Sequence, residues 1–123
     1  MQDYTTLSEL LELTRQTGSL PQAVLEHYGR EGADKKEAVE RMRTSLAVMR
    51  ASIQEGLNPD AKSMSGRVGG QSAKLMKSLL NGESFGGKPI GLASAYALAA
   101  AECNACMGRI VAAPTAGACG VLP

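Results

Sequence analysis

Apolar residues in the first half of the chain recur at helical spacing, and the first predicted helix has a clear start. The segment Thr6-Leu7-Ser8-Glu9 has the pattern of a capping box, in which a hydroxyl and a carboxylate satisfy free N–H groups of the first turn. Gly18 is a suitable stop for this helix. One face of the predicted helix carries Leu7, Leu10, Leu11 and Thr14.

A second start signal follows at Ser19-Leu20-Pro21-Gln22, where proline stands early in the helix and its missing N–H group costs nothing. We expect this shorter helix to continue to Gly29. The first part of the chain therefore predicts two short, capped helices in succession.

The clearest pattern begins at Asp34-Lys35-Lys36-Glu37 and ends at Gly56. Within it, apolar residues alternate at spacings of three and four, which places them in one stripe along a helix. The stripe could be the seam of a coiled coil, but packing against neighbouring helices is the commoner outcome for a stripe of this length. We predict that its members are buried: Val39, Met42, Leu46, Met49 and Ile53.

The composition changes after Gly56. Residues 57–70 are polar and glycine-rich, a helix is predicted from about Ser72 to Leu80, and a further loop leads into an alanine-rich segment from Gly91 to Ala112. Alanine has the highest helix propensity, so we expect a buried central helix there. No alternating strand pattern of useful length appears. The sequence predicts an all-α fold, with capped amphipathic helices in 1–56 and glycine-rich loops with a buried helix in 57–123.

Composition and charge exclude several classes of function. The chain has 123 residues, a net charge of +1, one Phe and no Trp, so nothing predicts a nucleic-acid surface. The start of the chain lacks a signal-peptide pattern. The longest apolar run, Ile90 to Ala101, is too short and too weakly hydrophobic for a membrane span. We expect a cytoplasmic protein with no membrane partner.

The cysteines form the sharpest local pattern, Cys103-x-x-Cys106, with Cys119 a short distance further on. Thiolates at this spacing bind zinc or iron–sulfur clusters or perform redox exchange. The alternative is that residues three apart on one helix face serve as small apolar side chains. The only histidine, His27, is far away in sequence, and no hydrolytic triad can be assembled.

Two short loops offer backbone N–H groups and hydroxyls. Ser65-Gly66-x-x-Gly69-Gly70 precedes a predicted helix, and N–H groups at a helix N-terminus bind anions well. Pro114-Thr115-Ala116-Gly117 is a turn with a hydroxyl and free donors. On pattern alone, ordinary connectors are at least as common.

The stretches "SMSGRVGGQSAKLMK" and "NACMGRIVAAPTAGACGVLP" resemble those of the alpha chain of bacterial iron–sulfur-dependent L-serine dehydratases. The resemblance runs through the whole sequence and implies an N-terminal part of a larger helical catalytic domain. It implies deamination of L-serine to pyruvate and ammonia without pyridoxal phosphate. An iron of a [4Fe-4S] cluster would act as Lewis acid on the leaving hydroxyl.

The resemblance also carries expectations for particular residues. It implies that the cluster ligands lie downstream of Pro123, so Cys103, Cys106 and Cys119 are not ligands. It implies a separate beta subunit as the partner chain and no catalytic activity for residues 1–123 alone. The backbone and hydroxyl groups of the substrate pocket would come from Ser65, Gly66, Gly69, Gly70, Pro114, Thr115, Ala116 and Gly117.

Two other classes of function remain open on the residues. One is a non-catalytic helical module that binds a partner chain. The other is a small zinc or redox protein built on the Cys-x-x-Cys pattern. A zinc protein of this kind would contain stoichiometric zinc.

Overall fold

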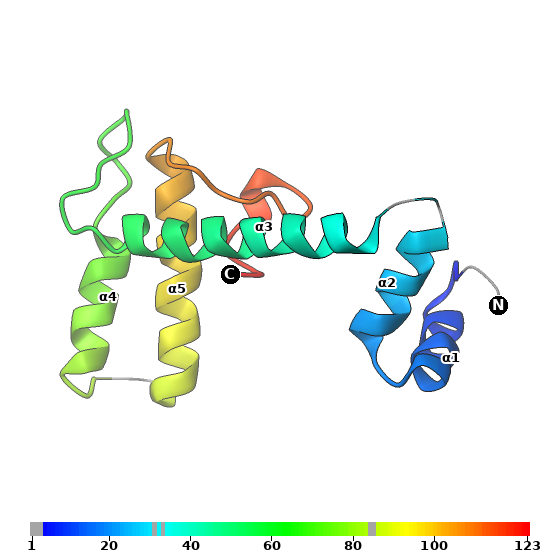
Figure 1. The fold of residues 1–123 in the computed structure, drawn as a ribbon. Coiled ribbons are helices and arrows are strands. Elements are labelled where there is room, and N and C mark those ends of the chain that lie inside the picture. Colours follow the sequence, from blue (N-terminus) through cyan, green and yellow to red (C-terminus); the bar gives the residue numbers. More distant parts are fainter. Residues whose placement is uncertain (1–3, 31, 33, 84–85) are drawn as a thin grey trace. The chain divides into compact units, whose positions relative to one another are not determined.

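The computed structural model describes residues 4–30, 32, 34–83 and 86–123. Within these ranges the chain forms five α-helices, one 3-10 turn and no strand, which confirms the predicted all-α fold (Figure 1). Every helix in the described ranges is too short or too polar to cross a membrane. The chain divides into two compact units, residues 1–43 and 44–123, which are described separately. The division at Gly56, which rested on composition, stays a prediction about domain organisation.

The first unit contains helices α1 (Leu7–Thr17) and α2 (Leu20–Arg30), which pack against each other. The capping box is present, because the Glu9 N–H donates to Thr6 Oγ1 (3.3 Å) and the Thr6 N–H donates to Glu9 Oε2 (3.0 Å). Backbone N–H bonds from Thr5 and Thr6 hold the pKa of the Glu9 carboxyl below its usual value. Gly18 ends α1 in the left-handed region (φ 85°), as predicted.

Helix α3 (Lys35–Gly56) starts where the sequence predicts, and the Lys36 N–H donates to Asp34 Oδ1 (2.8 Å). The prediction of one continuous buried stripe is wrong. Met49 and Ile53 are buried, whereas Met42 is 63% exposed and Leu46 is 47% exposed. The reason is that the buried positions of α3 all lie in its last two turns, where it crosses α5. The periodicity identifies the helix but not the length of its contact.

In the second unit, α4 (Gln71–Leu80) and α5 (Gly87–Ala105) pack side by side, and the last turns of α3 cross them (Figure 1). The core of α5 consists of small residues, with Ala95, Ala99 and Ala100 fully buried. At the crossing, a Cβ on Gly56 would overlap the Ala99 carbonyl group. Small residues therefore let two backbones approach closely, as the alanine-rich composition predicts.

The predicted helix 91–112 has different bounds, since α5 begins at Gly87 and ends at Ala105. Met107 adopts a left-handed conformation (φ 65°), and the Gly108 N–H donates to the Cys103 carbonyl (2.8 Å). A Cβ on Gly108 would overlap Cys103 Sγ and lie 2.9 Å from Glu55 Oε2. The chain thus turns back against α5, and residues 106–112 are not helical.

Candidate functional site

The first glycine-rich loop, residues 57–70, folds back on itself through Ser63. The Ser63 N–H donates to the Val68 carbonyl (2.8 Å), and the Val68 N–H donates to Ser63 Oγ (3.2 Å). Ser65 and Gly66 form the exposed tip, with Ser65 Oγ lying 3.2 Å from Ser63 Oγ. The tip therefore presents a hydroxyl and backbone to solvent.

The base of the same loop depends on glycine for steric reasons. Gly69 (φ 140°) and Gly70 (φ 75°) both have conformations that side chains rarely adopt. A Cβ on Gly69 would overlap the Ala61 carbonyl, and one on Gly70 would lie 2.8 Å from the Pro59 carbonyl oxygen. These two glycines let the loop close on itself where it meets α4.

A buried carboxylate lies at the N-terminus of α4. Glu102 of α5 is 1% exposed, and it accepts hydrogen bonds from the N–H groups of Gln71 (2.8 Å) and Ser72 (3.2 Å). Ser72 Oγ lies 2.7 Å from both Glu102 Oε2 and the Gly56 carbonyl oxygen. A hydroxyl has one proton, so Ser72 donates to one of these acceptors at a time. The network joins the ends of α3, α4 and α5.

The second predicted loop, residues 106–123, is fixed to α5. Asn104 Nδ2 donates to the Ala116 carbonyl (3.2 Å), and a Cβ on Gly120 would lie 2.5 Å from the Ala97 carbonyl oxygen. Residues 116–118 form a 3-10 turn that follows Thr115. The Thr115 backbone is extended and its side chain makes no capping bond to this turn. The four predicted site residues here are all exposed: Pro114, Thr115, Ala116 and Gly117.

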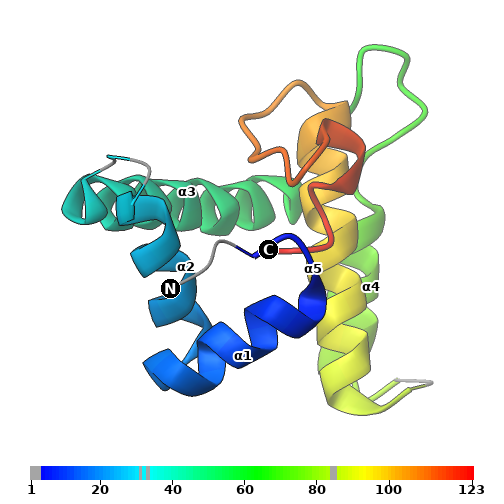
Figure 2. The same ribbon diagram turned by 90° about the vertical axis from the view of Figure 1, so that its right-hand side faces the viewer.

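Both loops rise from the same end of the α4–α5 pair, as two views of the ribbon agree (Figures 1 and 2). The Glu102 network accounts for this arrangement, because it joins the last turns of α5 to the start of α4. Among the described residues, no hydrogen bond links Ser65 or Gly66 to residues 114–117. The structure therefore places the two predicted halves of the site at one end of the helix pair, without a described hydrogen bond between them.

Two of the three cysteines, Cys103 and Cys119, are buried thiols, and Cys106 is half-buried. Cys103 is buried, and its S–H group donates to Glu55 Oε2 (3.3 Å). Burial, with this hydrogen bond and the charge of Glu55, raises the pKa of Cys103 to about 12. Cys119 is also buried, and its Sγ lies 3.6 Å from the Ala100 carbonyl oxygen. Both thiols serve as small buried residues that donate to oxygen.

The described residues do not fit an iron–sulfur cluster. A cluster is held by several converging thiolates, whereas Cys103 Sγ faces Glu55 and Cys119 Sγ faces the Ala100 carbonyl. No group of three or more His, Cys, Asp or Glu side chains in the described ranges is arranged to hold a metal ion. That the cluster ligands lie elsewhere in a longer chain stays a prediction.

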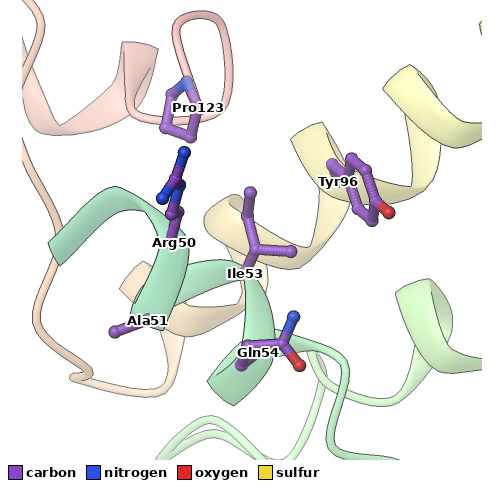
Figure 3. Close-up of a pocket in the computed structure, with 6 residues that line it drawn as sticks. All are labelled: Arg50, Ala51, Ile53, Gln54, Tyr96 and Pro123. Carbon is purple, nitrogen blue, oxygen red and sulfur yellow. The ribbon is translucent and has the colours of Figure 1, made fainter. Parts of the chain in front are cut away.

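Two of the hollows formed by the described residues lie in the second unit. One, of about 430 Å³, lies between α3 and α5, and Arg50 and Ile53 project into the same region from α3 (Figure 3). Its lining is Arg50, Ala51, Ile53, Gln54, Tyr96 and Pro123. The other, of about 510 Å³, runs along α5 and includes Gly117, the one predicted site residue in either hollow. Its lining is Ala93, Ser94, Ala97, Ala101, Gly117, Gly120 and Val121.

Sequence reasoning missed Glu102, Ser72 and Asn104 as residues that position the loops. Glu102 had a recognisable signal, because it is an acidic residue directly after the longest apolar run. An acidic side chain on a buried helix is almost always paired. Its partners, which lie about thirty residues earlier in the chain, had no signal in the local pattern.

The fold and the loops define an all-helical domain that carries two glycine-containing loops at one end of a helix pair. Comparison with known families gives the particular assignment: the family described as "Serine dehydratase alpha chain" matches residues 5–123. The chain belongs to this family, which confirms the resemblance found in the sequence. No solved structure matches the chain significantly.

Several named relatives are similar over nearly the whole chain. A probable L-serine dehydratase, alpha chain, of Bacillus subtilis (strain 168) is 35% identical over 122 residues, which cover 98% of this chain and 40% of the relative. The L-serine dehydratase alpha chain of Peptoniphilus asaccharolyticus is 28% identical, over 96% of this chain and 41% of the relative. L-serine dehydratase TdcG of Escherichia coli (strain K12) is 29% identical, over 98% and 28%. The chain therefore spans less than half the length of these relatives.

Proposed function

We propose that this chain is part of an L-serine ammonia-lyase, which converts L-serine to pyruvate and ammonia. The observation that carries the proposal is the match to the serine dehydratase alpha chain family over residues 5–123. The named relatives support the same activity, since their printed names are those of L-serine dehydratases. The partner in this proposal is a beta chain, which the alpha-chain names of two relatives suggest.

In this proposal the two loops bind the carboxylate of L-serine. A carboxylate is held well by backbone N–H groups and hydroxyl donors, because charge-assisted hydrogen bonds are the strong ones. The exposed hydroxyls of Ser65 and Thr115 are the proposed side-chain donors. Backbone N–H groups would come from Ala116 and Gly117. Gly66, whose N–H already donates to the Ser63 carbonyl (2.8 Å), and Pro114, which has no N–H, would shape the two loops, while Gly69 and Gly70 shape the base of the first.

The proposed cofactor of the complete enzyme is a [4Fe-4S] cluster, with no pyridoxal phosphate. Its thiolate ligands would come from outside residues 1–123, since the thiols of this chain do not gather into a cluster site. The proposed contribution of this chain is to bind and orient the substrate.

The substrate role of the second loop is tested by Thr115→Val in the complete enzyme. Valine keeps the shape and removes the donor, so kcat/KM should fall about ten- to a hundredfold, as expected for a hydrogen bond to a charged group. Thr115→Ser, which keeps the hydroxyl, should retain most of the activity. Iron content and visible absorbance should be the same in all three proteins. Normal kinetics in Thr115→Val would show that this hydroxyl does not bind the substrate.

The enzyme assignment is tested by serine-dependent pyruvate formation. The complete alpha chain with its beta partner should form pyruvate, and residues 1–123 alone should not, even after incubation with iron and sulfide. Pyruvate formation by the 123-residue chain would contradict the proposal that essential groups lie outside it. A complete assembly without any serine-dependent activity would favour a non-catalytic helical module.

A further inference from the structure

The N-terminus of a helix attracts anions, because its first N–H groups lack partners within the helix and point outward. At α4 the first two of these groups are already occupied. The Gln71 N–H donates to one carboxylate oxygen of Glu102, and the Ser72 N–H and hydroxyl face the other. Gly70, the residue before α4, supplies no side-chain cap. Glu102 therefore caps the N-terminus of α4, as the Thr6 side chain caps the N-terminus of α1.

The Glu102 contact is also deeply buried and long-range. Glu102 and Ser72 are both at most 1% exposed, and thirty residues separate them in the chain. The residues directly before Gln71 are Gly69 and Gly70, whose backbones close the loop against Ala61 and Pro59. The hydrogen bonds that hold the start of α4 in place therefore also hold the base of loop 57–70 in place.

We infer that Glu102 is an internal anion for the N-terminus of α4 and, through it, the positioning residue of loop 57–70. The inference rests on the proposed function in one respect, namely that this loop binds the carboxylate of the substrate. It adds that the substrate does not use the N-terminus of α4, because a carboxylate of the protein fills it. The substrate is then bound by the tip of the loop, at Ser65, while Glu102 determines where that tip lies.

The positioning role is tested without any enzyme assay, on the 123-residue chain. Glu102→Ala removes the anion, so trypsin should cleave after Lys62 and Arg67, which are exposed in the loop, about ten to a hundred times faster. Amide exchange at Gln71 and Ser72 should accelerate by a similar factor. Sodium acetate should reverse a large part of both effects, because acetate can occupy the vacated position, whereas sodium chloride at equal ionic strength should not.

The chain contains a matched control on the same helix. Ser78 and Glu83 form an exposed serine–glutamate pair at the C-terminal end of α4, with Oγ and Oε2 2.6 Å apart. Glu83→Gln should leave the cleavage of loop 57–70 unchanged. If Glu102→Ala does not fold, Glu102→Gln serves instead, since it keeps the size and one acceptor oxygen while placing an NH₂ group against Ser72. It should show a smaller increase in cleavage that is not reversed by acetate.

In the complete enzyme, Glu102→Gln should raise KM for L-serine about tenfold with kcat changed no more than about twofold, as expected for a loop that binds substrate. Unchanged cleavage and exchange in Glu102→Ala would overturn the inference, as would equal rescue by acetate and chloride. If the unaltered enzyme has no activity on serine, the proposed function fails. The cleavage and exchange results then still decide the role of Glu102.

Discussion

The two units of this chain are stabilised by different kinds of interaction. In residues 4–43, helix ends are fixed by neighbours in the sequence, such as the Thr6–Glu9 capping box and the Asp34 cap. In residues 44–123, the helices are joined by close backbone contacts of glycine and alanine and by the buried Glu102 network. Local capping can be recognised in a short window of sequence, whereas contacts between distant segments cannot. The first unit should therefore tolerate substitutions that the second does not.

The largest contrast is expected within α3. Ile53→Ala removes a buried side chain and should lower the free energy of unfolding by about 2–5 kcal/mol. Leu46→Ala, on the same helix but about half exposed, should cost about 1 kcal/mol or less. Chemical denaturation of both variants measures the difference. Equal losses would show that the buried stripe extends further along α3 than the structure describes.

A pair of helical glycines gives the next contrast. Gly56→Ala places a methyl group on the Ala99 carbonyl and should destabilise the protein by about 1–3 kcal/mol. Gly29→Ala in α2 meets only the flexible Lys35 side chain, so it should be neutral or stabilise by up to about 1 kcal/mol. Thermal unfolding of the two variants provides the comparison. A stable Gly56→Ala protein would mean that the close crossing of α3 and α5 is not needed.

The two serine–glutamate pairs formed by serines of α4 compare a buried interaction with an exposed one. Ser72→Ala leaves the buried Gly56 carbonyl and Glu102 without a hydroxyl donor, and should cost about 1–3 kcal/mol. Ser78→Ala breaks an exposed pair, and its effect should stay within about 0.5 kcal/mol. Urea titrations of both variants test this. Effects of the same size would remove the distinction between the buried and the exposed pair.

The capping box of α1 should contribute less to the free energy of unfolding than the buried contacts of the second unit. Thr6→Ala removes the hydroxyl that accepts the Glu9 N–H, at a cost of about 1 kcal/mol. Circular dichroism should show the loss as a lower midpoint for the helices of the first unit. Thr6→Ser, which keeps the hydroxyl, should be close to the unaltered chain.

Acid should weaken the same cap. The pKa of Glu9 is lowered by its bonds to Thr5 and Thr6, so the carboxylate stabilises the folded state above its ordinary pKa of 4.5. This contribution is lost as the pH falls from 4.5 through the lowered value. Glu9→Gln should abolish that part of the acid dependence. Identical acid titrations of the two proteins would contradict the assignment.

The sequence predicted the helices well where their signals were local. The starts of α1 and α3 and the end of α1 at Gly18 follow from capping residues, and α4 differs by one residue from its predicted start. The end of α5 was wrong by several residues. An alanine-rich pattern contains no stop, and the turn at Met107 depends on the fit of Gly108 against Cys103 and Glu55.

The candidate site was predictable as a set of loop residues but not as an arrangement. The motifs around Ser65 and Thr115 identify the two loops and the family, whose match to residues 5–123 confirms the resemblance. The roles of these residues in substrate binding stay predictions. The sequence contained no sign that Glu102 joins α5 to α4, because hydrogen bonds across thirty residues leave no periodic pattern.

The three thiols near the end of α5 form a graded set, with Cys103 and Cys119 buried and Cys106 half-buried. A thiol whose pKa is raised to about 12, such as Cys103, is almost entirely protonated at neutral pH and reacts only after the structure opens. The alkylation rates at the three positions therefore report how often each part of the structure opens locally. Cys106 should react first, so a fluorophore attached there would report on the second loop. The slower labelling rate of Cys103 would measure how often α5 separates from Glu55.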